Sequence, residues 1–258
     1  MEKFYNIFDS HAHYDDESFD NDRESLIRDL FDNKGVCGIV NNSVDLKSAQ
    51  NLLELSQKFN GVYSTVGFHP ENLTDVPKDY LYQMEQFLKN DKVVAIGEVG
   101  LDYHWDTPHD LQHKYLAEQM GLAVTLDVPL VIHNREAHGD TIDFLRKFRP
   151  QKCLIHCYSG SVEMLSELIK LGCYISLGGV VTFKNAVHPV DVAKAVPIDR
   201  LLLETDAPYM TPVPFRGKRC DSSHILYTAQ RIAELRCIGV QELLNQTMQN
   251  AKEFYNIL

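Results

Sequence analysis

The sequence predicts an α/β fold, namely a (β/α)8 TIM barrel with a metal site at the C-terminal ends of its strands. Short β-like runs alternate with amphipathic stretches at a spacing of about 30 residues, which is typical of parallel βαβ units. Eight such runs fit a closed barrel, and the 258 residues of the chain match the roughly 250 residues of this fold. A doubly wound open sheet would give a similar alternation, so it stays open as an alternative.

The predicted strands follow one another along the whole chain. They cover residues 5–9, 36–40, 62–67, 93–97, 129–133, 153–156, 173–177 and 201–204. No linker, sequence repeat or low-complexity segment divides them. We therefore expect one domain over residues 1–258.

Helices are predicted between several of these strands. Apolar residues share a helical face in residues 26–31, 46–59, 80–88 and 165–169. Gly35, Asn60-Gly61 and Gly172 are expected to end the first, second and last of these helices. Ser161 is a suitable N-cap for the last one. Residues 222–258 are predicted to form two further helices.

Composition and charge limit the class of protein. Hydrophobic residues make up 44% of the chain, enough for a large core, and the net charge is −11. That charge argues against a sequence-independent nucleic-acid coat, but a nuclease whose site is made positive by metal ions remains compatible with it. We expect neither a signal peptide nor a membrane span. Six cysteines without a Cys-x-x-Cys pair then indicate reduced thiols and a cytoplasmic protein, and no obligate protein partner is evident.

Potential metal ligands recur at the ends of five predicted strands. Because the C-terminal ends of barrel strands surround one pocket, these side chains are expected to converge. Each alone has a simpler explanation, such as a satisfied polar group or a turn, but six such residues in these positions are improbable by chance. They are His11, His13, Glu98, His133, His156 and Asp206.

The donor set predicts two divalent metal ions as cofactors. His11 and His13 lie two residues apart and so point to the same face of a strand. If Glu98 is shared, each ion has three protein ligands and keeps an open position. Mixed nitrogen and oxygen ligands accept Zn²⁺, Mg²⁺ or Mn²⁺, so the identity of the ions stays open.

Two ions roughly 3.5–4 Å apart suit the hydrolysis of a phosphoester. Asp206 and Glu98 are the predicted catalytic residues: Glu98 joins the ions, and Asp206 ligates one ion and accepts a proton from the attacking water. Glu204 lies two residues before Asp206 and would either orient a metal ligand or belong to a buried ion pair.

Four further side chains are candidates for substrate binding. Arg135, two residues after His133, could grip a phosphate with two parallel hydrogen bonds. Arg216 and Lys218 belong to a positive run in the loop after the eighth strand, where phosphate sites often lie on this fold; a solvated charged loop is the alternative. His69 ends the third strand and could contact the leaving group or support a ligand.

Cys153 and Cys157 flank His156 but do not have the spacing of a thiolate zinc site. Odd positions of that strand are expected to face away from His156. Both cysteines are therefore predicted to pack in the barrel wall.

Seven segments together resemble the signature blocks of the TatD family of metal-dependent deoxyribonucleases, which are TIM barrels related to the amidohydrolases. The segments are residues 9–13, 67–70, 97–103, 133–137, 156–160, 204–208 and 216–219. The resemblance runs from residue 9 to about 256. It implies that DNA is the substrate and that nucleotides are released, often from the 3′ end. Single strands and ends are expected to be preferred for a physical reason, because a chain end can enter a closed barrel mouth whereas a phosphate within a duplex meets an acidic rim.

The resemblance also implies a ligand assignment. His11, His13 and Asp206 would bind one metal, His133 and His156 the other, and Glu98 both. Two departures from the family pattern concern substrate preference, because both are expected at the pocket rim. Cys220-Asp221-Ser222 replaces the usual Asn-Glu-Pro, and His104 stands where an aromatic residue is common.

Two other functions remain open. An amidohydrolase or lactonase could use the same ligands on a small substrate, although such barrels often bridge their metals with a carboxylated lysine and no Lys ends a predicted strand here. A non-catalytic metal-binding scaffold is the second alternative, but a scaffold has no need of an open two-metal site.

Overall fold

The computed structural model describes residues 3–257 and contains one sheet of eight parallel strands. The strands are paired in sequence order, as in a barrel. They are β1 (Ile7–Ala12), β2 (Val36–Asn41), β3 (Val62–Val66), β4 (Val93–Asp102), β5 (Leu130–Arg135), β6 (Cys153–Ile155), β7 (Tyr174–Leu177) and β8 (Leu201–Leu203).

The first and last strands meet just beyond β8, which brings the sheet close to full closure. Ala12 of β1 forms a parallel bridge with Ala207. The amide of His13 donates to the carbonyl of Ala207 at 2.7 Å, and the amide of Asp206 donates to that of His11 at 2.9 Å. The TIM-barrel prediction is therefore confirmed, and the open sheet is excluded.

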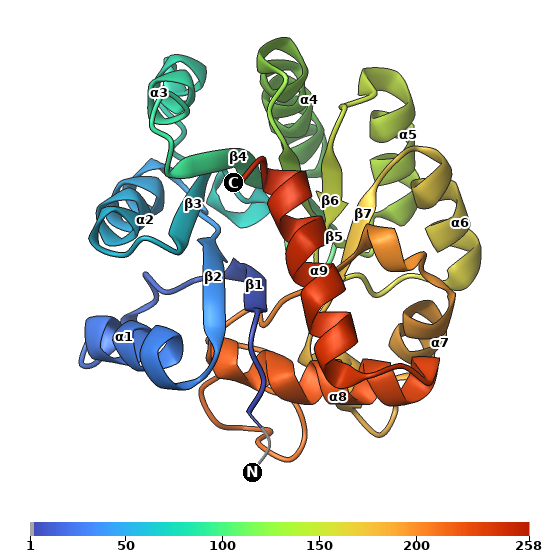
Figure 1. Cartoon of the computed structure of the whole chain (residues 1–258). Coiled ribbons are helices and arrows are strands. Elements are labelled where there is room, and N and C mark those ends of the chain that lie inside the picture. Colours follow the sequence, from blue (N-terminus) through green and yellow to red (C-terminus); the bar gives the residue numbers. More distant parts are fainter. Residues whose placement is uncertain (1–2, 258) are drawn as a thin grey trace.

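Helices follow the strands and surround them (Figure 1). They are α1 (Arg23–Asn33), α2 (Leu46–Lys58), α3 (Tyr80–Phe87), α4 (His109–Leu126), α5 (His138–Phe148), α6 (Val162–Lys170), α7 (Val187–Ala195), α8 (Ile225–Arg236) and α9 (Val240–Tyr255). Every helix with a predicted apolar face is present, including both in the C-terminal tail. Ser161 caps α6 as predicted, since its side chain accepts a hydrogen bond from the amide of Met164.

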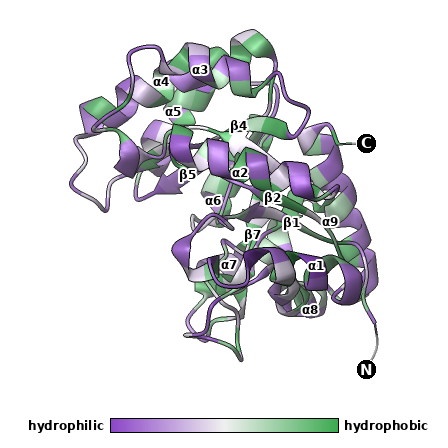
Figure 2. Cartoon of the chain, turned by 90° about the vertical axis from the view of Figure 1, so that its left-hand side faces the viewer, coloured by the Kyte–Doolittle hydropathy of each residue, from purple (hydrophilic) through white to green (hydrophobic). Residues whose placement is uncertain are grey.

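The hydrophobic core has two parts. One lies between the strands and the surrounding helices, whose outer faces are largely hydrophilic (Figure 2). The other lies inside the barrel, where residues such as Phe8, Val131 and Leu202 pack against Phe254 and Tyr255 of α9. Helix α9 crosses the ring of strands in Figure 1. It thus closes the N-terminal opening of the barrel, which leaves the opposite end for a site.

Two strands extend three or more residues past the ends that the sequence analysis predicts. β1 extends to Ala12, so His11 lies within it, and β4 extends to Asp102 rather than ending at Gly97. The extension of β4 pairs with β5 as far as Asp102 opposite Arg135. This pairing carries the backbone beyond the barrel wall and holds Glu98 in a strand.

In the part of the chain from 3 to 257, no helix combines the length and the apolarity needed to cross a membrane. One domain over residues 1–258 remains a prediction.

Candidate metal centre

A cavity of ≈ 800 Å³ opens at the C-terminal ends of the strands. Five of the six predicted ligands line it, and the sixth, His11, is buried beneath them. His11 lies on β1, Glu98 on β4 and His133 on β5, while His156 and Asp206 follow β6 and β8. The structure therefore brings together side chains that are up to 195 positions apart in the sequence.

The first group of donor atoms surrounds one oxygen of Glu98. Nε2 of His11 lies 3.2 Å from Oε2 of Glu98 and 3.2 Å from Nε2 of His13. Nε2 of His13 lies 3.4 Å from Oδ1 of Asp206. Two imidazoles and two carboxylates thus direct one atom each at a common point.

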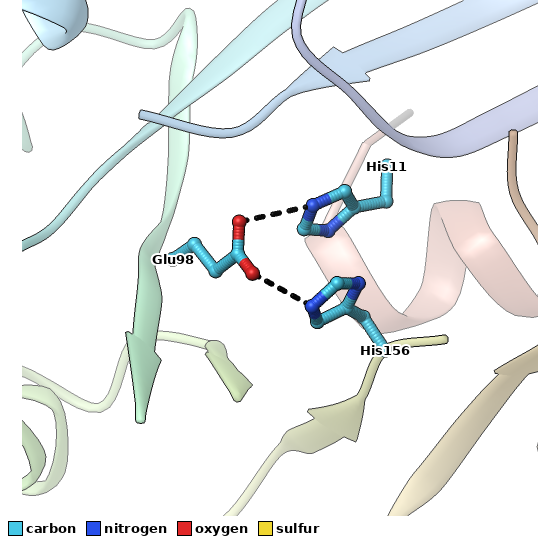
Figure 3. A group of neighbouring side chains, drawn as sticks. All are labelled: His11, Glu98 and His156. Atoms are coloured by element: carbon cyan, nitrogen blue, oxygen red, sulfur yellow. Dashed lines mark ion pairs between the residues drawn. The ribbon is translucent and has the colours of Figure 1, made fainter. Parts of the chain in front are cut away.

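The second group surrounds the other oxygen of Glu98. Oε1 lies 2.7 Å from Nε2 of His156 and 2.9 Å from Nδ1 of His133. These two nitrogens are 3.2 Å apart. Figure 3 shows the carboxylate of Glu98 between His11 on one oxygen and His156 on the other. One residue therefore belongs to both groups.

Hydrogen bonds at the far side of the rings set which nitrogen faces the centre. Nδ1 of His13 donates to the carbonyl of Asn42 at 2.9 Å, and Nε2 of His133 donates to Asp102 at 2.8 Å. In the neutral rings the inward nitrogens then carry lone pairs, as metal ligands require.

Glu204 lies behind His156. Its Oε1 is 3.7 Å from Nδ1 of His156, and its Oε2 accepts a hydrogen bond from Ser176. Both Oε1 and Nδ1 are buried, and neither has a hydrogen-bond partner in the described chain. The position agrees with either predicted role of Glu204, which stays a prediction.

This arrangement fits divalent cations. Carboxylate oxygens lie 2.7–3.5 Å from imidazole nitrogens, so positive charge belongs between them, either as protons on the rings or as metal ions that replace those protons. Donor atoms bonded at about 2.0–2.2 Å to one tetrahedral ion lie roughly 3.3–3.6 Å apart; the first group has this spacing, whereas the contacts of Glu98 with His156 and His133 have hydrogen-bond lengths. Three sets of donors in the described residues are close enough to share an ion, namely His11, Glu98 and His156; His11, His13 and Asp206; and His69, Glu98 and His133.

The pKa values of the buried groups also indicate a site that favours positive charge. Burial disfavours the charged form of Glu98, but His156 and His11 outweigh it and hold the pKa of Glu98 well below its usual value. Burial lowers the pKa of His13, yet the contact with Asp206 and the charge of Glu98 raise it to about 9. The buried carboxylates therefore stabilise positive charge at this point, either as protons on the imidazoles or as metal ions that replace those protons.

His69 lies in the same cavity, but its inward nitrogen carries the proton. Its Nδ1 accepts a hydrogen bond from the amide of Glu71 at 3.2 Å, so the proton resides on Nε2, 3.7 Å from Oε1 of Glu98. Burial, with the charge of His133 next, lowers its pKa to about 3 and keeps the ring neutral. His69 is thus arranged as a hydrogen-bond donor, in agreement with its predicted contact to substrate.

The basic side chains that are predicted to bind the substrate line two different cavities. Arg135 lines the metal cavity, with its guanidinium 5.8 Å from the ring centre of Trp105. Arg216 and Lys218 line a neighbouring cavity of ≈ 920 Å³, which shares Tyr209 with the first. Only Arg135 is therefore brought to the metal cavity; all three roles stay predictions.

Sequence reasoning missed Asp102 and Asn42, which orient His133 and His13. Asp102 lies four residues after Glu98 on β4, so the two-residue period of a strand could have indicated it. Asn42 acts through its backbone carbonyl, which leaves no signal in the residue type.

Two predictions about position are wrong. Cys157 lines the metal cavity rather than facing away, because β6 ends at Ile155 and Cys157 has a left-handed backbone with φ 43°; Cys153 packs in the wall as predicted. The segment from Cys220 to Ser222 is not at the rim, since Cys220 and Ser222 are fully buried.

Ser222 instead takes part in a buried hydrogen-bond network around Asp9. Its hydroxyl donates to Asp9 at 2.7 Å, and the hydroxyl of Thr205 donates to the same oxygen at 2.6 Å. Burial raises the pKa of Asp9 to about 7. The network ties β1 to the loop after β8, on either side of His11 and Asp206.

Comparisons with known proteins agree with this architecture. A family model for TatD related DNase matches residues 8–256. The metal-dependent hydrolase YabD of Bacillus subtilis is 39% identical, over 97% of this chain and 99% of that protein. The metal-dependent hydrolase YcfH of Escherichia coli K12 is 33% identical, over 97% of this chain and 96% of that protein. The crystal structure of YJJV, a TatD homolog from Escherichia coli K12, has a TM-score of 0.92 at 29% identity, over 98% of this chain and 99% of that chain.

Proposed function

Because the chain belongs to the TatD related DNase family and is a metal-dependent hydrolase, we propose that it hydrolyses phosphodiester bonds of DNA with two divalent cations. The observation that carries this proposal is Glu98, whose two carboxylate oxygens face two separate groups of donor atoms in one cavity. Zn²⁺, Mg²⁺ and Mn²⁺ are all candidates.

The proposed ligands belong to the two groups of donor atoms around Glu98. His11, His13 and Asp206 would hold one cation, His133 and His156 would hold the other, and Glu98 would provide a ligand to both. Bound there, the cations would polarise phosphoryl oxygens and lower the pKa of water.

Asp206 is the proposed proton acceptor. Burial opposes its ionised form, but the contact with His13 and the charges of His13 and His11 lower its pKa. Oδ1 faces the first donor group, and among residues 3–257 no hydrogen-bond donor contacts Oδ2. An ionised carboxylate with one uncommitted oxygen suits the removal of a proton from an attacking water.

Two other side chains would bind the phosphate. His69 presents its Nε2 proton to the cavity, and Arg135 presents a guanidinium at the side of the same cavity. Glu204 would hold His156 through Nδ1.

We further propose a preference for single strands and for 3′ ends. Helix α9 closes the barrel from below, so substrate enters from the open end alone. Asp15, Asp16 and Glu71 lie around that entrance. A free end can pass them with few phosphates nearby, whereas a duplex would bring many phosphates against carboxylates. We also propose a cytoplasmic, single-domain protein; its six cysteines are free.

Purified protein supplied with Mg²⁺, Mn²⁺ or Zn²⁺ tests the proposal on single-stranded DNA labelled at either end. We expect a 3′ label to be released at once as mononucleotide and a 5′-labelled strand to shorten stepwise. Circular duplex should be cut slowly or not at all. Equal cleavage of linear and circular duplex would contradict the end preference. Turnover of lactone or N-acyl substrates but no diester would favour the amidohydrolase.

Substitutions of the basic side chains in the two cavities are expected to have different effects on KM. Arg135→Ala should raise KM for single-stranded DNA about tenfold, the value of roughly one charge-assisted hydrogen bond, and change kcat little. The double variant Arg216→Ala, Lys218→Ala should raise KM by only about threefold, because Asp16 and Glu17 line the same cavity and offset its positive charge. Steady-state kinetics would measure both.

Arg231→Ala, on the exposed face of α8, is the matched control. A larger KM effect from the double variant than from Arg135→Ala would assign the main phosphate contact to the neighbouring cavity.

A further inference from the structure

Trp105 is an aromatic side chain held at the mouth of the metal cavity. It is the one tryptophan of the sequence, and 51% of it is exposed. It lines the metal cavity and also a neighbouring hollow of ≈ 540 Å³. Its position at the mouth places an exposed aromatic face within reach of a ligand in the metal cavity.

The backbone before Trp105 is fixed to the metal centre. The amide of His104 donates to Oδ1 of Asp102 at 2.9 Å, while Oδ2 of Asp102 accepts from His133 at 2.8 Å. The amide of Tyr103 donates to the carbonyl of Arg135 at 3.0 Å. Residues 102–105 therefore keep a set position relative to the proposed second cation.

The ring of Trp105 has a cation and an edge contact around it. The guanidinium carbon of Arg135 lies 5.8 Å from its centre. The ring of His104 meets it edge-on at 4.9 Å and 83°, and Nδ1 of His104 lies 3.3 Å from Glu136. A flat indole beside a guanidinium matches a nucleotide, since a base stacks on the ring and a phosphate pairs with the cation.

We propose that Trp105 and Arg135 bind the nucleotide next to the scissile phosphate of single-stranded DNA, with its base stacked on the indole. This inference rests on the proposed function. A protein with a net charge of −11 has little general attraction for DNA, so stacking supplies binding energy that phosphate contacts do not. Every base has a flat face, so the site accepts any sequence. His104 is a positioning residue for the ring.

Fluorescence of Trp105 tests the stacking directly, because no other tryptophan contributes to the signal. The metal-loaded Asp206→Asn protein is titrated with a thymidine hexanucleotide and with a hexamer of abasic deoxyribose phosphates. We expect saturable quenching by the first, and at least about tenfold weaker binding of the second in a polarisation assay. Unchanged fluorescence at saturation, or equal Kd values, would overturn the proposal.

Kinetics separate stacking from a merely structural role. Trp105→Ala should raise KM for the hexanucleotide at least about tenfold more than KM for the abasic hexamer, a chain of phosphodiesters without any aromatic ring. Trp105→Phe should recover most of the loss. The control is Tyr82→Ala, an exposed aromatic residue on α3 outside the cavity.

Equal losses on both substrates, or no recovery by Phe, would contradict base stacking. Failure of the proposed function has a different signature, because wild-type protein would then cleave neither diester. In that case fluorescence titration of the wild-type protein alone decides whether Trp105 binds a base.

Discussion

Glu98→Ala is expected to reduce metal content from two ions per chain to one or none and to lower turnover about 10³-fold or more. The carboxylate presents one oxygen to each donor group, at 3.2 Å from His11 and 2.7 Å from His156. Its removal would take a ligand from both proposed ions at once, and it would remove the buried negative charge that attracts cations to the site. Elemental analysis and steady-state kinetics measure the two effects.

A matched control keeps this result specific. Glu71→Gln changes another carboxylate that lines the same cavity and should leave metal content intact. Glu98→Gln preserves the side-chain volume, so circular dichroism can show that a loss of metal is not a loss of fold. Two bound ions and near-normal turnover in Glu98→Ala would remove Glu98 from the shared position.

Asp206→Asn should lower kcat by about 10² or more while the protein stays folded. The amide oxygen can still face His13, but it cannot accept a proton at neutral pH. Asn tolerates the left-handed backbone at this position, where φ is 59°. The backbone hydrogen bond from residue 206 to His11, 2.9 Å long, is also kept.

The comparison for this variant is Asp16→Asn, which makes the same change at the cavity wall. Thermal unfolding and metal content establish that both proteins are intact. An unchanged kcat in Asp206→Asn would mean that another group accepts the proton.

The sequence predicted the convergence of the six candidate ligands because that convergence follows from topology. Parallel barrel strands end at one face, so residues at strand ends must meet there. The proximity of His11 and Asp206, which are 195 positions apart, could therefore be predicted without knowing any single contact between them. The fold itself was predictable for a similar reason, since alternating strands and helices leave few arrangements.

Features that depend on the local path of the backbone were not predictable. Asp102 is close to His133 only because β4 continues past Gly97. Cys157 enters the cavity because its backbone is left-handed. The loop that holds Arg216 has no periodicity, so its course towards a separate cavity depends on contacts such as the stacking of Arg216 on Phe183 at 3.8 Å.

Helix α9 links the metal centre to the timing of synthesis. The hydroxyl of Tyr255 donates to the carbonyl of Ser10, 245 positions earlier and next to His11. During synthesis, the chain therefore contains its first proposed ligands long before helix α9, which closes the barrel next to them, has been made. We expect firm metal retention only after α9 has left the ribosome. Chains truncated after Ile238 should lose a bound divalent cation to a chelator that full-length chains resist, and equal retention would contradict this order of maturation.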